Sequence, residues 1–242
     1  MEHDAPVVVT GAMRNPTLPG ADGPANLLAS VRVAASPAAR GLGALVVMND
    51  EIHAARFVRK THTQSPATFR SDPVGPIGWV AEGRVRVALR PVGGWKIGAG
   101  RVGEIPRVAL LTAALGEEGL FLEDIRRHGY AGLVVEALGG GHVPSSMVEP
   151  LSRLAAEIPV VLASRTGSGE VLRSTYGFPG SEIDLIDRGL VPAGFLDGPK
   201  ARVLLSLLLA AGADRREVAG AFDSVPEALS SSPAPGSGGE RR

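Results

Sequence analysis

The strongest constraint on the fold class comes from short, uninterrupted apolar runs. The clearest is residues 44–48 (ALVVM), and similar runs lie at residues 108–111, 131–135 and 159–163. A run of this length without apolar–polar alternation is typical of a strand covered on both faces, as in a parallel sheet between helices. Segments with helical spacing separate the runs, at residues 24–35, 120–128, 145–157 and 199–211. The sequence therefore predicts an α/β protein.

The first part of the chain predicts one strand–helix–strand unit. It consists of a strand at residues 6–9, the helix at 24–35 and the strand at 44–48. Apolar side chains, including Leu27 and Val31, repeat at helical spacing within the helix. A connection of this kind between parallel strands is expected to be right-handed.

Glycine and proline suggest where the chain divides. At 242 residues it is long enough for one large domain or two modest ones. Residues 91–106 are rich in glycine and proline and show no period, which predicts a connection between domains. We therefore expect a first domain at residues 1–90 and a second at 107–223. Residues 224–242 are rich in Ser, Pro and Gly and are predicted to be a disordered tail.

Charge and composition exclude several classes of protein. Lys+Arg and Asp+Glu are balanced at 25 each, which leaves no electrostatic footprint for nucleic acid or an anionic membrane. No apolar run has membrane length. The absence of cysteine excludes a disulfide framework and a thiolate metal site, and it suits a reducing compartment. We expect a cytoplasmic protein, while a leader in an upstream segment stays open.

Lys60 is the first candidate for chemistry. It belongs to residues 59–63 (RKTHT), which follow the strand at 44–48 and combine cations, hydroxyls and an imidazole. Ligands bind at the carboxyl ends of strands in open α/β sheets, and a partly buried lysine can exchange a proton. The alternative is a solvated surface lysine. His53 and His62 match no common zinc spacing, so a metal site is not favoured.

Three loops are weaker candidates. Thr10-Gly11-Ala12 could offer a hydroxyl and backbone N–H groups, or be an ordinary turn. The glycine-rich loop at residues 138–142 lacks the Lys-Ser/Thr ending of a phosphate-binding loop. Ser164 and Arg165 follow a strand and could line a cleft.

Several motifs in order resemble the bacterial-type L-asparaginase/glutaminase family, whose members use a threonine nucleophile. In the first domain they are residues 7–14 (VVVTGAMR), 21–27 (ADGPANL), 46–56 (VVMNDEIHAAR), 58–63 (VRKTHT) and 69–79. In the second domain they are residues 132–143, 160–166 and 200–205 (KARVLL). The resemblance runs from about residue 6 to residue 222.

The resemblance implies a larger N-terminal α/β domain, incomplete here, and a smaller C-terminal α/β domain with a parallel sheet. It implies hydrolysis of the side-chain amide of asparagine, and in some members glutamine, without a metal or organic cofactor. Active sites in the family lie between the N-terminal domain of one subunit and the C-terminal domain of a neighbour. The implied partners are a small amino acid amide and further copies of the chain, in a dimer or tetramer.

The same resemblance assigns four site residues. Lys60 matches the family's catalytic lysine, and Ala12 matches a residue whose backbone lies beside the substrate amide. His142 falls where many members have a polar residue that reaches the neighbour's site, often asparagine. Glu170 could supply the neighbour's carboxylate, although residues 167–173 depart from the best-known pattern.

Two family motifs are absent from these residues. Neither a GGTI-type string, which carries the nucleophile, nor a TGTD-type string, which carries a second threonine and an aspartate, occurs in the sequence. We therefore expect an amino-terminally truncated chain that is inactive alone. The alternative is a non-catalytic truncated paralogue that binds a small amide or acid, or co-assembles with full-length subunits. An unrelated small-molecule-binding α/β protein is a third possibility, which the ordered motifs disfavour. The preference for asparagine over glutamine stays open.

Overall fold

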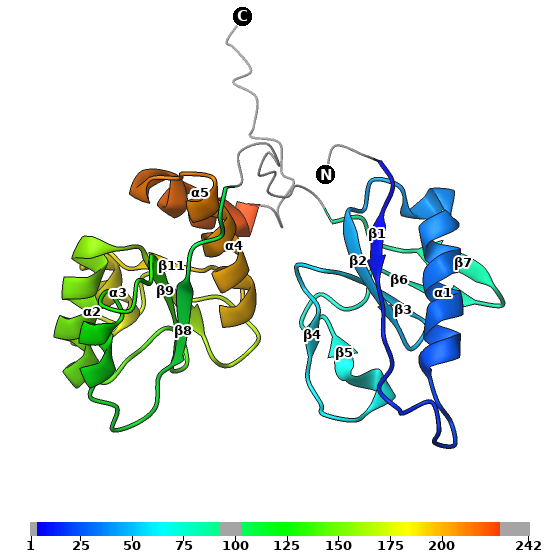
Figure 1. Cartoon of the computed structure of the whole chain (residues 1–242), viewed down its shortest axis with the longest axis horizontal. Helices are drawn as coiled ribbons and strands as arrows, with labels where there is room; N and C mark the ends of the chain where they lie inside the picture. Colours follow the sequence, from blue (N-terminus) through cyan, green and yellow to red (C-terminus); the bar gives the residue numbers. More distant parts are fainter. Residues whose placement is uncertain (1–3, 92–102, 228–242) are drawn as a thin grey trace, which may run out of the picture. The chain divides into compact units, whose positions relative to one another are not determined.

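The computed structural model describes residues 4–91 and 103–227, which belong to two compact units (Figure 1). Unit 1 ends at Pro91 and unit 2 begins at Val92. Most of the predicted connection at residues 91–106 lies outside the described residues. The predicted tail does so from residue 228, whereas residues 224–227 belong to the last helix of unit 2.

Unit 1 contains a five-stranded mixed sheet in the order β1-β2-β3-β6-β7. Its strands are β1 (Val7–Val9), β2 (Ala44–Met48), β3 (Glu51–Ala54), β6 (Gly78–Ala81) and β7 (Arg84–Val87). β1 and β2 are parallel and are joined through helix α1 (Gly23–Ala35), so the predicted strand–helix–strand unit is present. The remaining pairs are antiparallel, and β2 therefore has a parallel neighbour on one side and an antiparallel one on the other.

The β2–β3 hairpin explains why the apolar run stops at Met48. Asn49 and Asp50 form the two-residue loop and have φ angles of 52° and 60°. Positive φ at both central residues is the mark of the type I′ turn, whose twist matches that of the strands it joins. Asn and Asp are among the few residues other than glycine that tolerate this conformation.

Helix α1 packs on the sheet through its small and polar side. Ala29 and Val33 are buried against the unit 1 core, which also includes Leu45 and Val47 of β2. By contrast Leu27, Leu28 and Val31 are 60%, 51% and 58% exposed. The helical spacing of these apolar residues is real, but the face that they form is not covered within the described part of unit 1.

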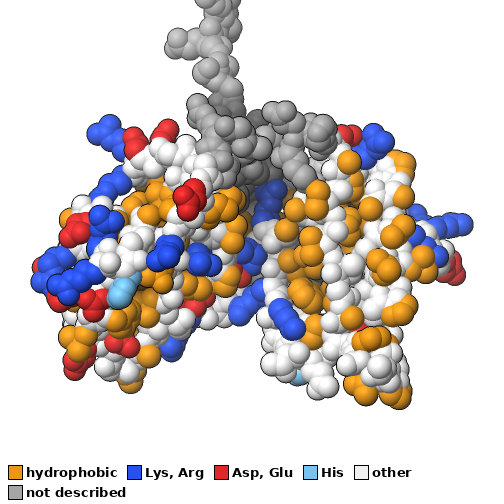
Figure 2. All heavy atoms as spheres, in the orientation of Figure 1, with side chains coloured by type: hydrophobic (Ala, Val, Ile, Leu, Met, Phe, Trp, Pro, Cys, Tyr) orange, Lys and Arg blue, Asp and Glu red, His pale blue; other side chains and the backbone are white. Residues whose placement is uncertain are grey.

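β1 is the edge strand beside this helix and is also apolar. Val7 and Val9 are 46% and 55% exposed, because β1 has only β2 as a neighbour. We call the exposed apolar side chains of α1, namely Leu27, Leu28 and Val31, the open face of unit 1. Val7 and Val9 lie on the other side of the sheet, because Val8 between them packs in the core with α1. Hydrophobic side chains are visible on the unit 1 surface in Figure 2.

Unit 2 contains a four-stranded parallel sheet in the order β11-β10-β9-β8, as predicted for the second domain. Its strands are β8 (Val108–Thr112), β9 (Gly132–Ala137), β10 (Val160–Ser164) and β11 (Val191–Pro192). Its helices are the 3₁₀ helix η4 (Leu120–Asp124), α2 (Ser145–Glu157), α3 (Glu182–Asp187), α4 (Gly198–Ala210) and α5 (Arg215–Glu227).

The central strands of unit 2 are covered on both faces. In β9, Leu133 and Val135 face one core, which also receives α2 and α3, while Val134 faces a second core with α4 and α5. Figure 1 shows α2 and α3 on one side of the sheet and α4 on the other, and α5 packs with α4 in the second core. This three-layer arrangement is why the strand sequences are continuously apolar.

Besides β3, which was not predicted as a strand, two local features differ from the predictions. Residues 120–128 were expected to be one α-helix, but the regular part is the short η4, between Gly119 in the left-handed region and a turn at Gly129. Leu122 and Ile125 are nevertheless buried. The second difference is a small sheet of β4 (Arg59–Lys60) and β5 (Phe69–Arg70) that the sequence analysis did not predict. No helix within residues 4–91 and 103–227 is long and apolar enough to cross a membrane.

Candidate functional site

Lys60 lies on the short strand β4, opposite Phe69 of β5. The next residues are tied down by the buried Thr68: its carbonyl accepts hydrogen bonds from both the N–H and the hydroxyl of Thr61, and its own hydroxyl accepts one from the N–H of His62 at 2.6 Å. The side chain of Lys60 is exposed and makes no hydrogen bond or ion pair with another described residue. The backbone that carries the lysine is therefore fixed while its ammonium group faces solvent.

Ala12 lies in an exposed loop that is held by the start of α1. The carboxylate of Asp22 accepts hydrogen bonds from the N–H of Met13 and Arg14, at 2.8 to 3.0 Å. Burial alone would raise the pKa of Asp22, but these hydrogen bonds and one from Asn26 outweigh burial and lower the pKa below its ordinary value. Asp22 is therefore an ionised anchor for the backbone that follows Ala12.

Asn26 connects the same loop to the β2–β3 hairpin. Its Nδ2 donates to the carbonyl of Gly11 and to Asp22, both at 3.0 Å, and its Oδ1 accepts from the N–H of Asn49 at 3.0 Å. The side chain is 3% exposed. Asn26 thus fixes the predicted substrate loop relative to the end of β2.

The buried His53 lies between a buried serine and a partly exposed glutamate. Its Nδ1 lies 2.9 Å from the hydroxyl of Ser71, and its Nε2 lies 3.3 Å from Glu51 Oε2, close enough for an ion pair but without hydrogen-bond geometry. His53 and Ser71 are 1% and 2% exposed, so a substrate has no access to this serine. Burial, partly opposed by the charge of Glu51, lowers the pKa of His53.

The described residues give no support for a metal site with His53 and His62 as ligands. His62 Nδ1 accepts hydrogen bonds from the N–H groups of Gln64 and Ser65, both at 3.0 Å, so this nitrogen stabilises its own loop. Over the described ranges, no group of three or more His, Cys, Asp or Glu side chains is arranged to hold a metal ion.

In unit 2 the glycine-rich loop follows β9, at the carboxyl edge of the parallel sheet. Gly139 and Gly141 have φ angles of 49° and 121°, which favour glycine. Gly140 accepts a hydrogen bond from the N–H of Leu172 at 2.8 Å, and a Cβ on Gly140 would lie 2.6 Å from Leu172 Cδ1. Backbone conformation and this close approach explain the run of glycines without a bound phosphate.

His142 ends this loop and is paired with Glu182 at the start of α3. Its Nε2 lies 3.1 Å from Glu182 Oε2. The other oxygen of Glu182 accepts hydrogen bonds from the N–H of Thr175 at 2.9 Å and of Tyr176 at 2.7 Å. Burial alone would raise the pKa of Glu182, but these backbone hydrogen bonds and the one from His142 lower it.

Glu170, the carboxylate suggested for the neighbour's site, is exposed and makes no hydrogen bond or ion pair with another described residue. The carboxylate that contacts His142 is Glu182 instead. The structure therefore does not pair the two predicted unit 2 residues, His142 and Glu170, with each other.

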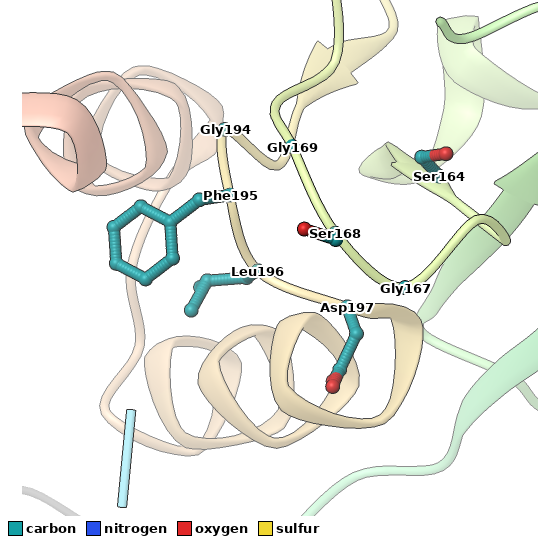
Figure 3. A pocket seen from close by; sticks show the side chains of 8 residues that line it. All are labelled: Ser164, Gly167, Ser168, Gly169, Gly194, Phe195, Leu196 and Asp197. Atoms are coloured by element: carbon teal, nitrogen blue, oxygen red, sulfur yellow. The ribbon is translucent and has the colours of Figure 1, made fainter. Parts of the chain in front are cut away.

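Ser164 also supports the glycine-rich loop, since its hydroxyl donates to the carbonyl of Gly139 at 2.6 Å. Ser164 lines a shallow hollow, open to solvent, together with Gly167, Ser168, Gly169, Gly194, Phe195, Leu196 and Asp197. Figure 3 shows this hollow between the loop after β10 and the segment that leads into α4. Asp197 is already engaged, because it accepts hydrogen bonds from the backbone N–H and the ammonium of Lys200. The expectation that Ser164 could line a cleft agrees with its place here.

The roles of Asp22, Asn26 and Glu182 were not predicted from the sequence. The string ADGPANL placed Asp22 just before a proline and a helix, a position where Asp is a common cap. Asn26, one helical turn later, falls on the buried side of the helix, and a polar residue there indicates a buried hydrogen-bond partner. Glu182 gave no comparable signal, because an acidic residue in the first turn of a helix normally faces solvent.

Comparison with known proteins places both units in one family. Residues 1–93 match the family described as asparaginase, N-terminal, and residues 107–222 match the glutaminase/asparaginase C-terminal domain. The chain belongs to the L-asparaginase family. The motifs of the resemblance thus lie in the parts of the chain that match the two asparaginase domains.

Three relatives illustrate the match. A probable L-asparaginase of Deinococcus radiodurans is 36% identical over 236 residues, covering 90% of this chain and 66% of the relative. L-asparaginase 2 of Escherichia coli is 33% identical over 225 residues, covering 91% of this chain and 63% of the relative. A protein of Haemophilus influenzae named probable L-asparaginase periplasmic is also 33% identical over 225 residues, with 91% and 63% covered. The chain thus spans 63% to 66% of the length of these relatives, less than two thirds.

Proposed function

We propose that this chain serves the hydrolysis of L-asparagine to L-aspartate and ammonia. The observation that carries the proposal is the match of both units, in order, to the two domains of the asparaginase family. Lys60 is assigned to proton transfer, and the backbone near Ala12 to the substrate amide. The ordered hydrogen bonds of Asp22 and Asn26 support the second assignment, because they hold this loop in one conformation.

The nucleophile is proposed to come from a polypeptide segment that is not among these 242 residues. The support is the absence of GGTI-type and TGTD-type strings from the sequence. A lysine can move protons, but it does not replace a positioned hydroxyl nucleophile and its partner carboxylate. The chain made alone is therefore proposed to be inactive. We also propose a homo-oligomer, in which His142 and Glu170 serve a neighbouring copy.

The test compares two purified forms. One is the 242-residue chain, and the other is extended upstream by about ninety in-frame codons, a length set by the missing domain portion. Ammonia release from L-asparagine and L-glutamine, with the elution volume on size exclusion, would be measured for both. Activity in the extended form and none in the short form is the expected result. Turnover by the short form would contradict the proposal and direct attention to Thr10.

Replacing Lys60 tests its role within an active form. Lys60→Ala should lower the rate by about 10²- to 10⁴-fold, because that is the usual contribution of a general acid or base. Lys200→Ala serves as the matched control. Lys200 lies on α4 of unit 2, where its ammonium group pairs with Asp197. A loss of less than about threefold for Lys60→Ala would exclude a role for Lys60 in proton transfer.

A second candidate function is a non-catalytic binding protein. The exposed ammonium of Lys60 and the missing strings favour it. Such a protein would bind L-aspartate or L-asparagine without turnover, or assemble with full-length subunits of the family. Calorimetric titration with L-aspartate, and co-purification with a co-expressed full-length relative, would identify it. An upstream in-frame stop codon close to Met1 would favour this candidate over the first.

A cytoplasmic location is also proposed. The absence of cysteine suits a reducing compartment but does not require one. One relative carries the word periplasmic in its name, so the family is not confined to one location. Fractionation of the native host, with immunodetection of the full gene product, decides the question.

A further inference from the structure

The small sheet of β4 and β5 brings two arginines together. The two strands lie side by side in unit 1, with Arg59 directly opposite Arg70 and Lys60 opposite Phe69 (Figure 1). Side chains that are directly opposite in an antiparallel pair share one face of the sheet, with Cβ atoms about 4.5–5.5 Å apart. Arg59 and Arg70 therefore extend from neighbouring positions on one face, and Lys60 belongs to the other face.

No carboxylate in residues 4–91 and 103–227 neutralises this pair. The side chains of Arg59 and Arg70 make no hydrogen bond or ion pair with another described residue. Residues 52–71 contain four Lys or Arg residues and no Asp or Glu. Glu51, which precedes this stretch, pairs with His53, and Asp72, which follows it, makes no ion pair with a described residue. The arginine pair thus lies in a segment of uncompensated positive charge.

The repulsion within the pair is imposed by the backbone. Like charges directly opposite each other destabilise a sheet. The pairing is nevertheless fixed next to the arginines, where the carbonyl of the buried Thr68 accepts hydrogen bonds from the N–H and the hydroxyl of Thr61. Arg59 is partly buried, which weakens the screening of its charge by water. An anion bound between the two guanidinium groups would replace this repulsion by two attractions.

The number of donors and charges favours phosphate as the anion. Each guanidinium group carries N–H donors in a planar fork and one permanent positive charge. A carboxylate has one charge and two oxygens, so one arginine satisfies it in a bidentate pair. A phosphate group has a charge of about −1.5 to −2 at pH 7 and at least three oxygens that accept hydrogen bonds. A phosphate group can therefore engage both arginines at once.

We propose that Arg59 and Arg70 form a binding site for a phosphate group, either the free ion or the phosphate of a small phosphomonoester. The site is on the face of the β4–β5 sheet opposite Lys60, so its occupation leaves the lysine exposed and stabilises the strand that carries it. The site does not depend on the proposed hydrolysis of L-asparagine, and its tests need no turnover.

Calorimetric titration of the whole chain with inorganic phosphate, at constant ionic strength, measures the site. One phosphate per chain is expected for the wild type. Arg59→Gln and Arg70→Gln should each weaken binding by about 10- to 100-fold, the usual effect of losing hydrogen bonds to a charged group. Lys60→Gln should weaken binding less than either variant, and Arg84→Gln on β7 should leave it unchanged. An equal loss in all four variants, or no binding by the wild type, would overturn the proposal.

Hydrogen exchange of the whole chain tests the repulsion without a ligand. In phosphate-free buffer of low ionic strength, Arg70→Gln is expected to slow exchange at the amide of Thr61, because removing the repulsion stabilises the pairing of β4 with β5. The same substitution in an Arg59→Gln background should give no further slowing. Phosphate added to the wild type should also slow this amide. Equal slowing by Arg70→Gln in both backgrounds would show that the two charges do not interact and would overturn the shared site.

Two further probes define the ligand. Succinate carries two negative charges on separate carboxylates, so it is expected to bind more weakly than inorganic phosphate. Binding of succinate as tight as that of phosphate would overturn the assignment of a phosphate group. Tighter binding of glycerol 3-phosphate than of inorganic phosphate would identify a phosphomonoester as the occupant, and equal or weaker binding would identify the free ion.

Discussion

Among single residues, Asn26 joins more of unit 1 than any sequence pattern indicated. It connects Gly11, Asp22 and Asn49 while being buried. Asn26→Ala would remove three hydrogen bonds made by a buried side chain, at a cost of about 1–3 kcal/mol in the free energy of unfolding. Denaturant unfolding measures this change. Asn15→Ala, in an exposed loop, should remain within about 0.5 kcal/mol. Equal effects of the two substitutions would contradict the assigned role of Asn26.

His53 gives unit 1 a dependence on pH. Its pKa is lowered in the folded chain, because the ring is buried. The unfolded chain therefore takes up the proton first as the pH falls below the ordinary value of about 6.5. The free energy of unfolding should decrease from there downward, by at most about 1.4 kcal/mol per pH unit for this one proton.

The measurement is thermal unfolding between about pH 5 and pH 8. The pKa values of Asp22 and Glu182 are also lowered in the folded chain. These carboxylates bind protons on unfolding only at lower pH, so they do not contribute in this range. His53→Gln can keep a hydrogen bond to Ser71 and should flatten the dependence. His128→Gln, at an exposed position, should not. A steep slope that survives in His53→Gln would assign the effect to another group.

At the scale of elements, the open face of unit 1 on α1 is uncovered, and β1 is an edge strand with Val7 and Val9 exposed. Exposed apolar side chains on an edge strand and an adjacent helix favour association. Replacing Leu27, Leu28 and Val31 together by Gln should reduce aggregation of the chain, measured by light scattering and size exclusion. The free energy of unfolding should change little, since these side chains are half or more exposed.

The control for the open face is Leu115→Gln in unit 2. Leu115 is 93% exposed but is an isolated loop residue. The substitution Leu115→Gln should therefore leave association of the chain unchanged. If the triple variant of α1 aggregates as strongly as the wild type, the open face is not the cause of association.

Elements with a strong, long pattern could be predicted from the sequence. β2 and α2 have the predicted bounds. A continuous apolar run over five residues, and helical spacing of apolar residues over thirteen, each fit one type of secondary structure. β3 was missed because Glu51 and His53 interrupt its apolar character, and its pairing depends on the turn at Asn49. β4 was missed because two residues carry no period at all.

The candidate site was predictable only in part. The resemblance supplied Lys60, Ala12, His142 and Glu170, and these assignments stay predictions. Residues that act through buried hydrogen bonds could not be found, because Glu182 and Asn26 are polar side chains on helices whose partners lie in distant parts of the chain. The three-dimensional contacts, not the local pattern, give them their roles.

At the scale of the whole molecule, the two units differ in how completely they bury their cores. Both cores of unit 2 consist of residues between Val108 and Phe222. A fragment of residues 103–227 should therefore fold by itself, with a stability on the order of 5–10 kcal/mol. Calorimetry would show one cooperative transition for the fragment and a matching transition in the full chain.

The comparison fragment is residues 4–91. It retains the open face of unit 1, so it should be less soluble than residues 103–227 at the same concentration. An unfolded 103–227 fragment would contradict the independence of unit 2. So would a transition in the full chain that cannot be separated into two parts.

The close approach of Gly140 to Leu172 also limits how this sequence can change over evolutionary time. The obstacle to a side chain at 140 is the tip of a leucine, which a smaller residue at 172 would remove. At Gly78, by contrast, a Cβ would meet the backbone carbonyl of Arg86, which no substitution can shorten. Positions 140 and 172 are therefore expected to co-vary among homologues, with Ala or Gly at 172 wherever 140 is not glycine. Position 78 should stay glycine throughout.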